Sequence, residues 1–401
     1  MPPTSAPPTI LCLSSYFKGN RFLQACKEAG WRVILVVREA VLSEPWARES
    51  CDEVFALPSL FDRAAVIKSI AYLARSRQID RIAPLDDFDV EMASTLREHM
   101  RIPGMGESTS RYFRDKLAMR ERCRDRGIAV PEFIHVLNAD RVAGFLRDVP
   151  PPWLIKPRSS ANSWGIAKFH EAGDLQRRVE ELGDDRSNWL IERYLPGDVY
   201  HVDGVICGGR ILLEEPHKYR RPLMDVAKGG GIFATRTLDR GSDEARELVA
   251  MHREVVRHFG FVNGVTHMEF IRARENGRLH FLETAARVGG AHIYDLVEAA
   301  TGVSLWTEWA RLEMFQGDGN YSMPAARQDY GGLIVALARQ ESPDTSCFSD
   351  PEVVVRLGKK HHVGLVLRSD SPRRIEELLD SYEPRIASDF LTTLPESAPA
   401  Q

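Results

Sequence analysis

The stretch that decides the fold is GVTHMEFIRARENGRLHFLETAARVGG, residues 264–290. Two runs of strand-forming residues flank Asn276-Gly277, a pair that is typical of a β-hairpin turn. With a three-residue loop over 275–277 and its glycine left-handed, Glu269 lies directly opposite Glu283. A two-residue loop would instead place the two glutamates on opposite faces of the sheet. The register of this hairpin therefore decides what it can bind.

We predict that Glu269 and Glu283 bind a divalent metal ion. Like charges directly opposite each other destabilise a sheet, so a site that keeps them needs a cation between them. Carboxylate oxygens on a rigid strand pair suit Mg²⁺ or Mn²⁺. The alternative, on the pattern alone, is an exposed hairpin whose two glutamates face solvent.

Arg287 follows Glu283 by four residues and precedes Gly289 and Gly290. An arginine beside a metal-carboxylate pair can orient a substrate carboxylate with two hydrogen bonds or stabilise a developing negative charge. The two glycines allow the backbone to approach a ligand closely. We therefore predict a substrate site at these three residues. A salt bridge between Arg287 and Glu283 is the alternative.

The first hundred residues alternate short apolar runs with amphipathic segments, for example over 9–13, 21–29 and 31–37. Strand and helix in alternation predict the α/β class, with a parallel, doubly wound sheet. Residues 14–20, after the first strand, contain one glycine and match neither the dinucleotide-binding loop nor the Walker pattern. We therefore expect this sheet not to bind a nucleotide.

Changes in composition along the chain suggest three units. Three consecutive prolines at 150–152 predict a stiff joint, and the chain becomes rich in strand-forming residues after about residue 329. We expect an N-terminal unit over 1–108, a central unit over 109–328 that includes a lid over 128–198, and a small C-terminal α/β lobe with a tail over 329–401.

The composition excludes several classes of protein. A chain of 401 residues exceeds what one core usually organises, and a net charge of −4 gives no overall attraction to nucleic acid or an anionic membrane. The six cysteines show no paired short spacing, which suits a reducing compartment. No apolar run approaches the about 20 residues of a membrane helix, and the N-terminus lacks a signal-peptide layout. We predict a soluble, cytoplasmic protein.

Five short motifs follow one another along the chain: Lys116, Ile155-Lys156-Pro157, the segment 191–197, His267-Met268-Glu269 and the segment 283–287. Their order resembles the ATP-grasp superfamily, and in particular its carboxylate–amine ligases, which are related to biotin carboxylase and D-alanine–D-alanine ligase. Within that superfamily the pattern is most similar to the L-amino acid ligases, which make dipeptides. The resemblance spans residues 10 to 385 and implies the ATP-grasp fold, with an N-terminal preATP-grasp sheet.

The resemblance implies an ATP site. Lysines would neutralise the phosphates, a loop of small residues would close over them, and the segment after 191 would hold the adenine. For Lys116 the alternative is an ordinary surface lysine, for the loop a surface turn, and for His267 a packed histidine. The implied nucleotide-binding residues are Lys116, Lys156, Ser159, Ser160, Ser163, Gly165, Glu192, Tyr194, Leu195, Asp198, Lys218 and His267.

The sequence departs from the family pattern at two positions. Many members have an asparagine two residues after the second metal-binding glutamate, where this chain has Ala285; the L-amino acid ligases share a small residue there. The family usually has a ribose-binding acid after the adenine-binding segment. Asp198 is the nearest candidate for it in this chain, and the alternative is that Val199 occupies that position. The glycine-rich segment 228–231 would either cradle an anion or form a flexible turn.

The activity that the resemblance implies is the joining of a carboxylate to an amine through an acyl phosphate, with release of ADP and phosphate. Arg287, Lys156 and Glu283 would take part in the chemical step, and the cofactors would be ATP and Mg²⁺ or Mn²⁺. Amino acids or small carboxylic acids would be the substrates, and a homodimer is expected by analogy. The alternatives are a carboxylase that phosphorylates bicarbonate and a non-catalytic ATP-binding subunit.

Overall fold

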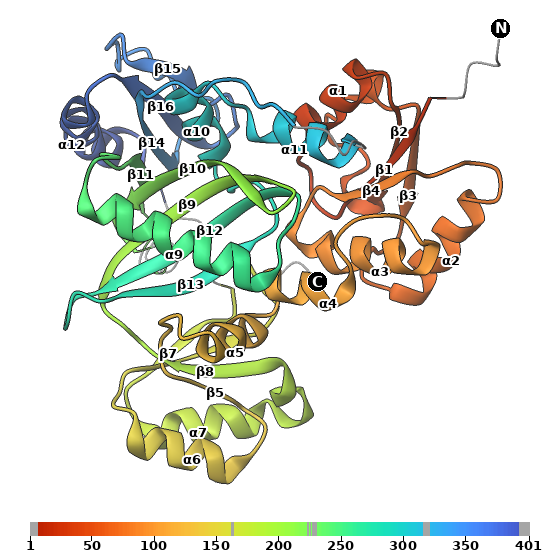
Figure 1. Cartoon of the computed structure of the whole chain (residues 1–401). Helices are drawn as coiled ribbons and strands as arrows, with labels where there is room; N and C mark the ends of the chain where they lie inside the picture. Colours follow the sequence, from red (N-terminus) through yellow and green to blue (C-terminus); the bar gives the residue numbers. More distant parts are fainter. Residues whose placement is uncertain are drawn as a thin grey trace, which may run out of the picture.

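The computed structural model describes residues 7–161, 164–222, 224, 226, 231–315 and 321–392. Figure 1 shows three parts: an N-terminal unit, a small lid and a large central unit that the C-terminal strands complete. Their sheets have the strand orders β3-β2-β1-β4, β5-β8-β6-β7 and β13-β12-β9-β10-β11-β14-β16-β15.

The N-terminal sheet is parallel throughout, as the alternation of strands and helices predicted. Its inner strands are apolar on both faces because helices cover both sides. Gly30, after the first helix, has the left-handed φ of 80° that ends helices. The elements are β1 (Thr9–Ser14), α1 (Asn20–Glu28), β2 (Arg32–Arg38), β3 (Glu53–Leu57), α2 (Arg63–Leu73), β4 (Arg81–Pro84), α3 (Val90–Met100) and α4 (Glu107–Ser110), with short helices η1 (Glu39–Val41), η2 (Arg48–Ser50) and η3 (Asp87–Asp89).

The lid carries an antiparallel sheet of its own with two helices on one side, and it lies inside the predicted range 128–198. The helix that precedes it begins where the Asp115 side chain accepts hydrogen bonds from the first-turn N–H groups. The elements before the lid are η4 (Arg111–Phe113) and α5 (Lys116–Asp125). Those of the lid are β5 (Phe133–His135), α6 (Ala139–Asp148), β6 (Trp153–Pro157), β7 (Ala167–Phe169), α7 (Ala172–Glu181), η5 (Gly183–Asn188) and β8 (Trp189–Arg193).

The central unit is built on an eight-stranded sheet. The strands expected in a separate C-terminal lobe, β14 to β16, extend this sheet through the pairing of β11 with β14. The elements are β9 (Gly197–Cys207), β10 (Arg210–Tyr219), β11 (Phe233–Thr237), α9 (Asp243–Phe259), β12 (Gly264–Ala273), β13 (Leu279–Ala285), α10 (Ile293–Thr301), α11 (Leu305–Met314), β14 (Tyr330–Leu337), β15 (Val353–Arg356), β16 (His362–Ser369) and α12 (Pro372–Asp389).

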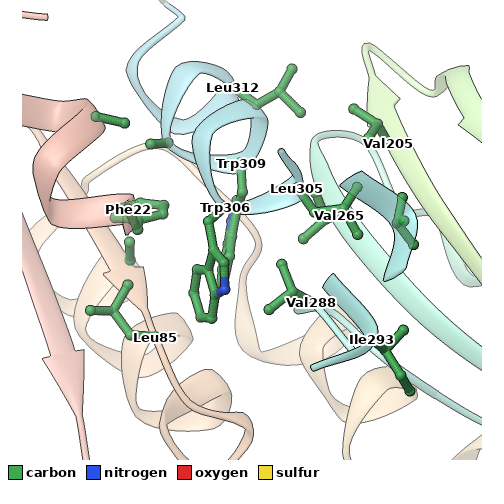
Figure 2. Close-up of a cluster of buried hydrophobic side chains, with 14 of the residues drawn as sticks. Phe22, Leu85, Val205, Val265, Val288, Ile293, Leu305, Trp306, Trp309 and Leu312 are labelled. Atoms are coloured by element: carbon green, nitrogen blue, oxygen red, sulfur yellow. The ribbon is translucent and has the colours of Figure 1, made fainter. Parts of the chain in front are cut away.

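Helix α11 forms a core between the N-terminal unit and the central sheet (Figure 2). The Trp309 ring packs edge-on against Phe22 of α1, with ring centroids 5.3 Å apart, and stacks on Trp306 at 5.7 Å. Val288 and Ile293 belong to the same core. Packing on α11 therefore holds both ends of the loop that follows β13.

None of the helices in the described part of the chain is long and apolar enough to cross a membrane.

We expect Trp309→Ala to lower the free energy of unfolding by about 3–5 kcal/mol, because it leaves a cavity in the core between the N-terminal unit and the central sheet. Unfolding in urea, followed by tryptophan fluorescence and circular dichroism, measures this loss. Tyr72→Ala is the control, since Tyr72 is 66% exposed, and it should change stability by less than about 0.5 kcal/mol. Equal effects of the two substitutions would contradict the role given to α11.

Candidate active site

A cavity of about 380 Å³ lies where the central sheet, the lid and the N-terminal unit meet. Asp87 lines it from the turn after β4, Lys156 from β6, Val199 from β9 and Glu269 from β12. The predicted site residues that line this cavity are Lys116, Lys156, Ser160, Glu192, Tyr194, Leu195, His267, Glu269, Glu283, Arg287 and Gly290.

Glu269 and Glu283 are directly opposite each other on β12 and β13, which confirms the predicted arrangement. The three-residue loop was wrong, however. The Ala273 N–H donates to the Arg278 carbonyl at 2.9 Å, so the loop runs over 274–277. A register shift between Glu269 and the next residue restores the expected pairing, because it inserts one extra residue into β13.

One oxygen of each glutamate is already bound. Tyr219 donates its hydroxyl to Oε1 of Glu269 at 2.9 Å, and the Lys116 Nζ lies 2.9 Å from Oε2 of Glu283. Within the described ranges, no other hydrogen bond or ion pair reaches Glu269 Oε2 or Glu283 Oε1. Two open carboxylate oxygens on adjacent strands are the donor set that a hard divalent cation takes.

Glu283 is ionised near neutral pH. Burial would raise its pKa, but the nearby Lys116 and Lys156 outweigh burial and lower it. Its side chain is 38% exposed to the solvent-filled cavity, so solvent screens the attraction to Lys116. A cation at the open Oε1 can therefore bind beside the lysine at Oε2 and does not have to displace it.

Lys156 is buried and forms an ion pair with Oε1 of Glu192. Arg120 donates to Oε2 of the same carboxylate from Nη2 at 3.0 Å. Burial lowers the pKa of Lys156 to about 8, against the opposing effect of Glu192. This ammonium group is thus prepared to gain an anionic partner in the cavity.

Arg120 also connects the lid to the hairpin. Its Nη1 donates to the carbonyl of Leu282, the residue that the bulge leaves unpaired. The bulge frees a backbone carbonyl, and a buried carbonyl needs a donor. The Arg120 guanidinium group therefore donates both to the carbonyl at the bulge on β13 and to the carboxylate of Glu192 on β8.

His267 lies between two carboxylates. Its Nδ1 is 3.0 Å from Asp203 Oδ1, and its Nε2 is 3.5 Å from Glu269 Oε1. Burial would lower its pKa, but the two carboxylates raise it to about 9. The imidazole is thus cationic at neutral pH and contacts one of the two predicted metal ligands.

Several predicted residues lie outside this cavity. Asp198 is exposed and pairs with Lys218 at 2.8 Å, while its neighbour Val199 lines the cavity, because successive strand residues face opposite sides. Their nucleotide contacts stay predictions, as do those of Ser159, which is exposed, and Gly165, which packs on Pro157. Ser163 and residues 228–230 of the glycine-rich segment lie outside the described residues.

Gly289 does not line the cavity but lies against its wall. A Cβ atom there would come within 3.0 Å of Asp203 Oδ1 and 2.6 Å of Ile293 Cγ2. The position therefore requires glycine for close packing. Gly290, one residue on, lines the cavity as expected.

Sequence reasoning missed Asp87 and Arg114. Arg114 donates from Nη1 to Asp87 Oδ2 at 2.5 Å, and Arg287 Nε lies 3.5 Å from Asp87 Oδ1. Burial would raise the pKa of Asp87, but Arg114 and Arg287 outweigh it and lower the pKa. The signal was the acidic turn 86–89 after a parallel strand, since ligands bind at the carboxyl ends of such strands.

Two curated relatives share part of the sequence, although no known family model matches the chain. The L-arginine-specific L-amino acid ligase of Bacillus subtilis is 23% identical over 303 residues, which cover 74% of this chain and 72% of the relative. A D-alanine–D-alanine ligase of Syntrophotalea carbinolica is 26% identical over 130 residues, or 32% of this chain and 38% of the relative.

Solved structures show the same fold. The L-amino acid ligase of Bacillus licheniformis superposes with a TM-score of 0.74 at 14% identity, over 98% of this chain and 100% of the other. The biotin carboxylase domain of the Hydrogenobacter thermophilus 2-oxoglutarate carboxylase, in complex with MgADP and bicarbonate, gives 0.67 at 17% identity, over 92% and 89%. These matches show that the chain has the ATP-grasp fold and is similar in sequence and structure to ATP-grasp ligases of the carboxylate–amine type.

Proposed function

We propose that this chain uses ATP to activate the carboxylate of one amino acid or small acid as an acyl phosphate. It then joins the acyl group to an amine and releases ADP and phosphate. The observation that carries this proposal is the pair of opposed glutamates, each with one open oxygen, in the same cavity as Lys116, Lys156 and Arg287. The ADP and MgADP complexes of structures with the same fold support it.

The residues of the cavity have separable tasks in this reaction. Glu269 and Glu283 would hold Mg²⁺, or Mn²⁺ in its place, through their open oxygens. A cation there would supply positive charge beside the transferred phosphoryl group. Lys116 and Lys156 add positive charge beside the phosphates, and Arg287 orients the attacking carboxylate so that it meets the phosphorus in line.

Asp87 and Arg287 suit an amino acid substrate. Asp87 Oδ1 and Arg287 Nε are buried and face each other at 3.5 Å as an ion pair, and among the described residues neither atom makes a hydrogen bond. The one can accept from an ammonium group and the other can donate to a carboxylate, so the pair complements both ends of a zwitterion. A substrate with only one of these groups leaves the other residue unsatisfied.

We also propose a cytosolic location and a homodimer. All six cysteines are free thiols, which suits a reducing compartment. The biotin carboxylase domain with the same fold is described as a dimer. Light scattering of the purified chain tests the dimer.

The assay for the activity is release of ADP and phosphate with pairs of amino acids, in Mg²⁺ or Mn²⁺. We expect turnover that needs both a carboxylate and an amine, with the joined product detected by mass spectrometry. Release of AMP and pyrophosphate would contradict the proposal. Turnover that requires bicarbonate and no amino acid would show a carboxylase instead.

We expect Glu283→Gln to lower kcat/KM by about a hundred- to a thousandfold, because it removes one of two charged metal ligands. Steady-state ADP release with a saturating amino acid pair measures the loss. The matched control is Glu254→Gln on α9, an exposed glutamate that pairs with Arg257, and it should keep wild-type activity. Full activity of Glu283→Gln would remove the metal site from the mechanism.

We expect ATP binding to take up a proton at about pH 8.5. Lys156, with its pKa of about 8, is then mostly neutral, and the phosphates favour its charged form, so up to about 0.8 proton enters. Calorimetry in buffers of different ionisation enthalpy measures this uptake. Lys156→Arg should abolish it because arginine stays charged, whereas Lys360→Arg, at an exposed lysine that pairs with Glu341, should keep it. The same uptake in both variants would contradict the assignment.

We expect Asp87→Asn to raise KM for the amino acid about tenfold or more and to leave ATP affinity unchanged, because it removes a charged hydrogen-bond acceptor. Asp89→Asn is the control on the same turn, since the Asp89 carboxyl accepts from Ser15 and not from a ligand. Initial rates against each substrate measure both constants. An unchanged KM would place the ammonium group elsewhere.

A further inference from the structure

A buried group of polar side chains lies behind the predicted metal site. Asp203 on β9 is fully buried, with imidazole rings on both sides: His201 Nδ1 is 2.7 Å from Oδ2, and His267 Nδ1 is 3.0 Å from Oδ1. His201 Nε2 is in turn 2.9 Å from the Thr235 hydroxyl. Both oxygens of this carboxylate therefore have a partner.

The strand register places this group beside the metal ligand. His267 is paired with Asp203 and Glu269 with His201, on neighbouring antiparallel strands. Because side chains alternate between the two faces, these four residues share one face of the sheet. The buried carboxylate thus lies one row behind the glutamate that we assign to the cation.

The His267 ring lies between Asp203 and Glu269 and contacts both. Its other nitrogen, Nε2, is 3.5 Å from Glu269 Oε1, the oxygen that also accepts from Tyr219. Oε1 thus contacts two groups, and Oε2, which has no partner among the described residues, is the oxygen left for a cation. Partners of this kind fix metal ligands in proteins and are needed for affinity.

Asp203 also contacts the loop that carries Arg287. The Cβ that Gly289 lacks would meet Asp203 Oδ1 at 3.0 Å, so the loop backbone passes directly over the carboxylate. Gly289 is two residues from Arg287. One buried carboxylate is therefore in contact with the ring that holds a metal ligand and with the loop of the substrate arginine.

We propose that Asp203 is a positioning residue that fixes Glu269 through His267 and so sets the affinity of the site for its divalent cation. This inference rests on the proposed function, because it assumes that Glu269 binds the cation. Asp203 itself does not touch the substrate or the metal.

The same cluster has the composition of a metal site, since ligand atoms of His201, Asp203 and His267 all lie within 4.8 Å of one another. The hydrogen bonds favour the positioning role. Each Nδ1 atom lies within hydrogen-bond distance of a different oxygen of one carboxylate, and a ring nitrogen that donates its N–H there has no lone pair to offer a metal ion. The experiment separates the two possibilities.

The test compares Asp203→Asn with Glu215→Gln. Glu215 is paired with Asp203 across β9 and β10, is 2% exposed and is bound by Arg240, so its substitution controls for the loss of a buried carboxyl group in the same row. The readout is binding of Mn²⁺ to the enzyme–ADP complex, measured by electron paramagnetic resonance of free Mn²⁺. Thermal unfolding shows whether each variant is folded.

We expect Asp203→Asn to raise the Kd for Mn²⁺ about 10- to 100-fold. The Kd for ADP without metal should be unchanged, and Glu215→Gln should stay within about twofold of wild type. His267→Gln should give the same rise, and the double variant no further rise, because both residues act through one contact. If Asp203→Asn does not fold, His267→Gln alone decides the outcome.

Three results would overturn the inference. The first is a Kd for Mn²⁺ that stays at the wild-type value in Asp203→Asn, or in His267→Gln where that variant decides. The second is an equal shift in Glu215→Gln. The third is a cation that the wild type binds without ADP and Asp203→Asn does not, which would make the cluster itself the metal site. A wild-type protein that binds Mn²⁺ but shows no ligase activity would contradict the proposed function. The role of Asp203 in cation binding would still stand.

Discussion

Two carboxylates held directly opposite each other on neighbouring strands are the constraint on which the rest of the site depends. Glu269 and Glu283 repel each other, and the sheet keeps them together at a cost. Tyr219 and Lys116 reduce that cost through one oxygen of each glutamate, and the other oxygen of each stays open. The repulsion that remains is what a divalent cation removes on binding.

The bulge in β13 makes this arrangement possible and also connects it to the lid. Without the extra residue, Leu282, the loop that the chain forms would set Glu283 on the wrong face. The carbonyl that the bulge frees is bound by Arg120, which also binds Glu192, the partner of Lys156. The bulge in β13 thus supplies an acceptor for Arg120, and Arg120 also binds Glu192 in the lid sheet.

The parts of the site that lie within one hairpin or one strand could be predicted from the sequence, and contacts between distant segments could not. The turn signal and strand alternation placed Glu269 opposite Glu283, although the bulge compensated for a loop that was wrong by one residue. The sequence pattern alone did not decide whether Asp198 or Val199 faces the cavity, because a shift of one residue along a strand moves a side chain to the other face of the sheet. Asp87 gains Arg287 only when the N-terminal unit meets the loop after β13, and Asp203 gains His267 only when β12 pairs with β9.

The buried charges of the cavity are better explained by function than by stability. Removing an ion pair such as Lys156–Glu192 from water costs more than well-packed apolar side chains would, so folding alone does not favour it. These charges line a cavity and are paired: Lys156 with Glu192 inside the lid sheet, and Lys116 of α5 with Glu283 on β13. Groups held in place before a ligand arrives need no reorganisation when charge develops. The cost of desolvation is then met once, during folding, and the site gains an arrangement that matches the charge distribution of phosphoryl transfer.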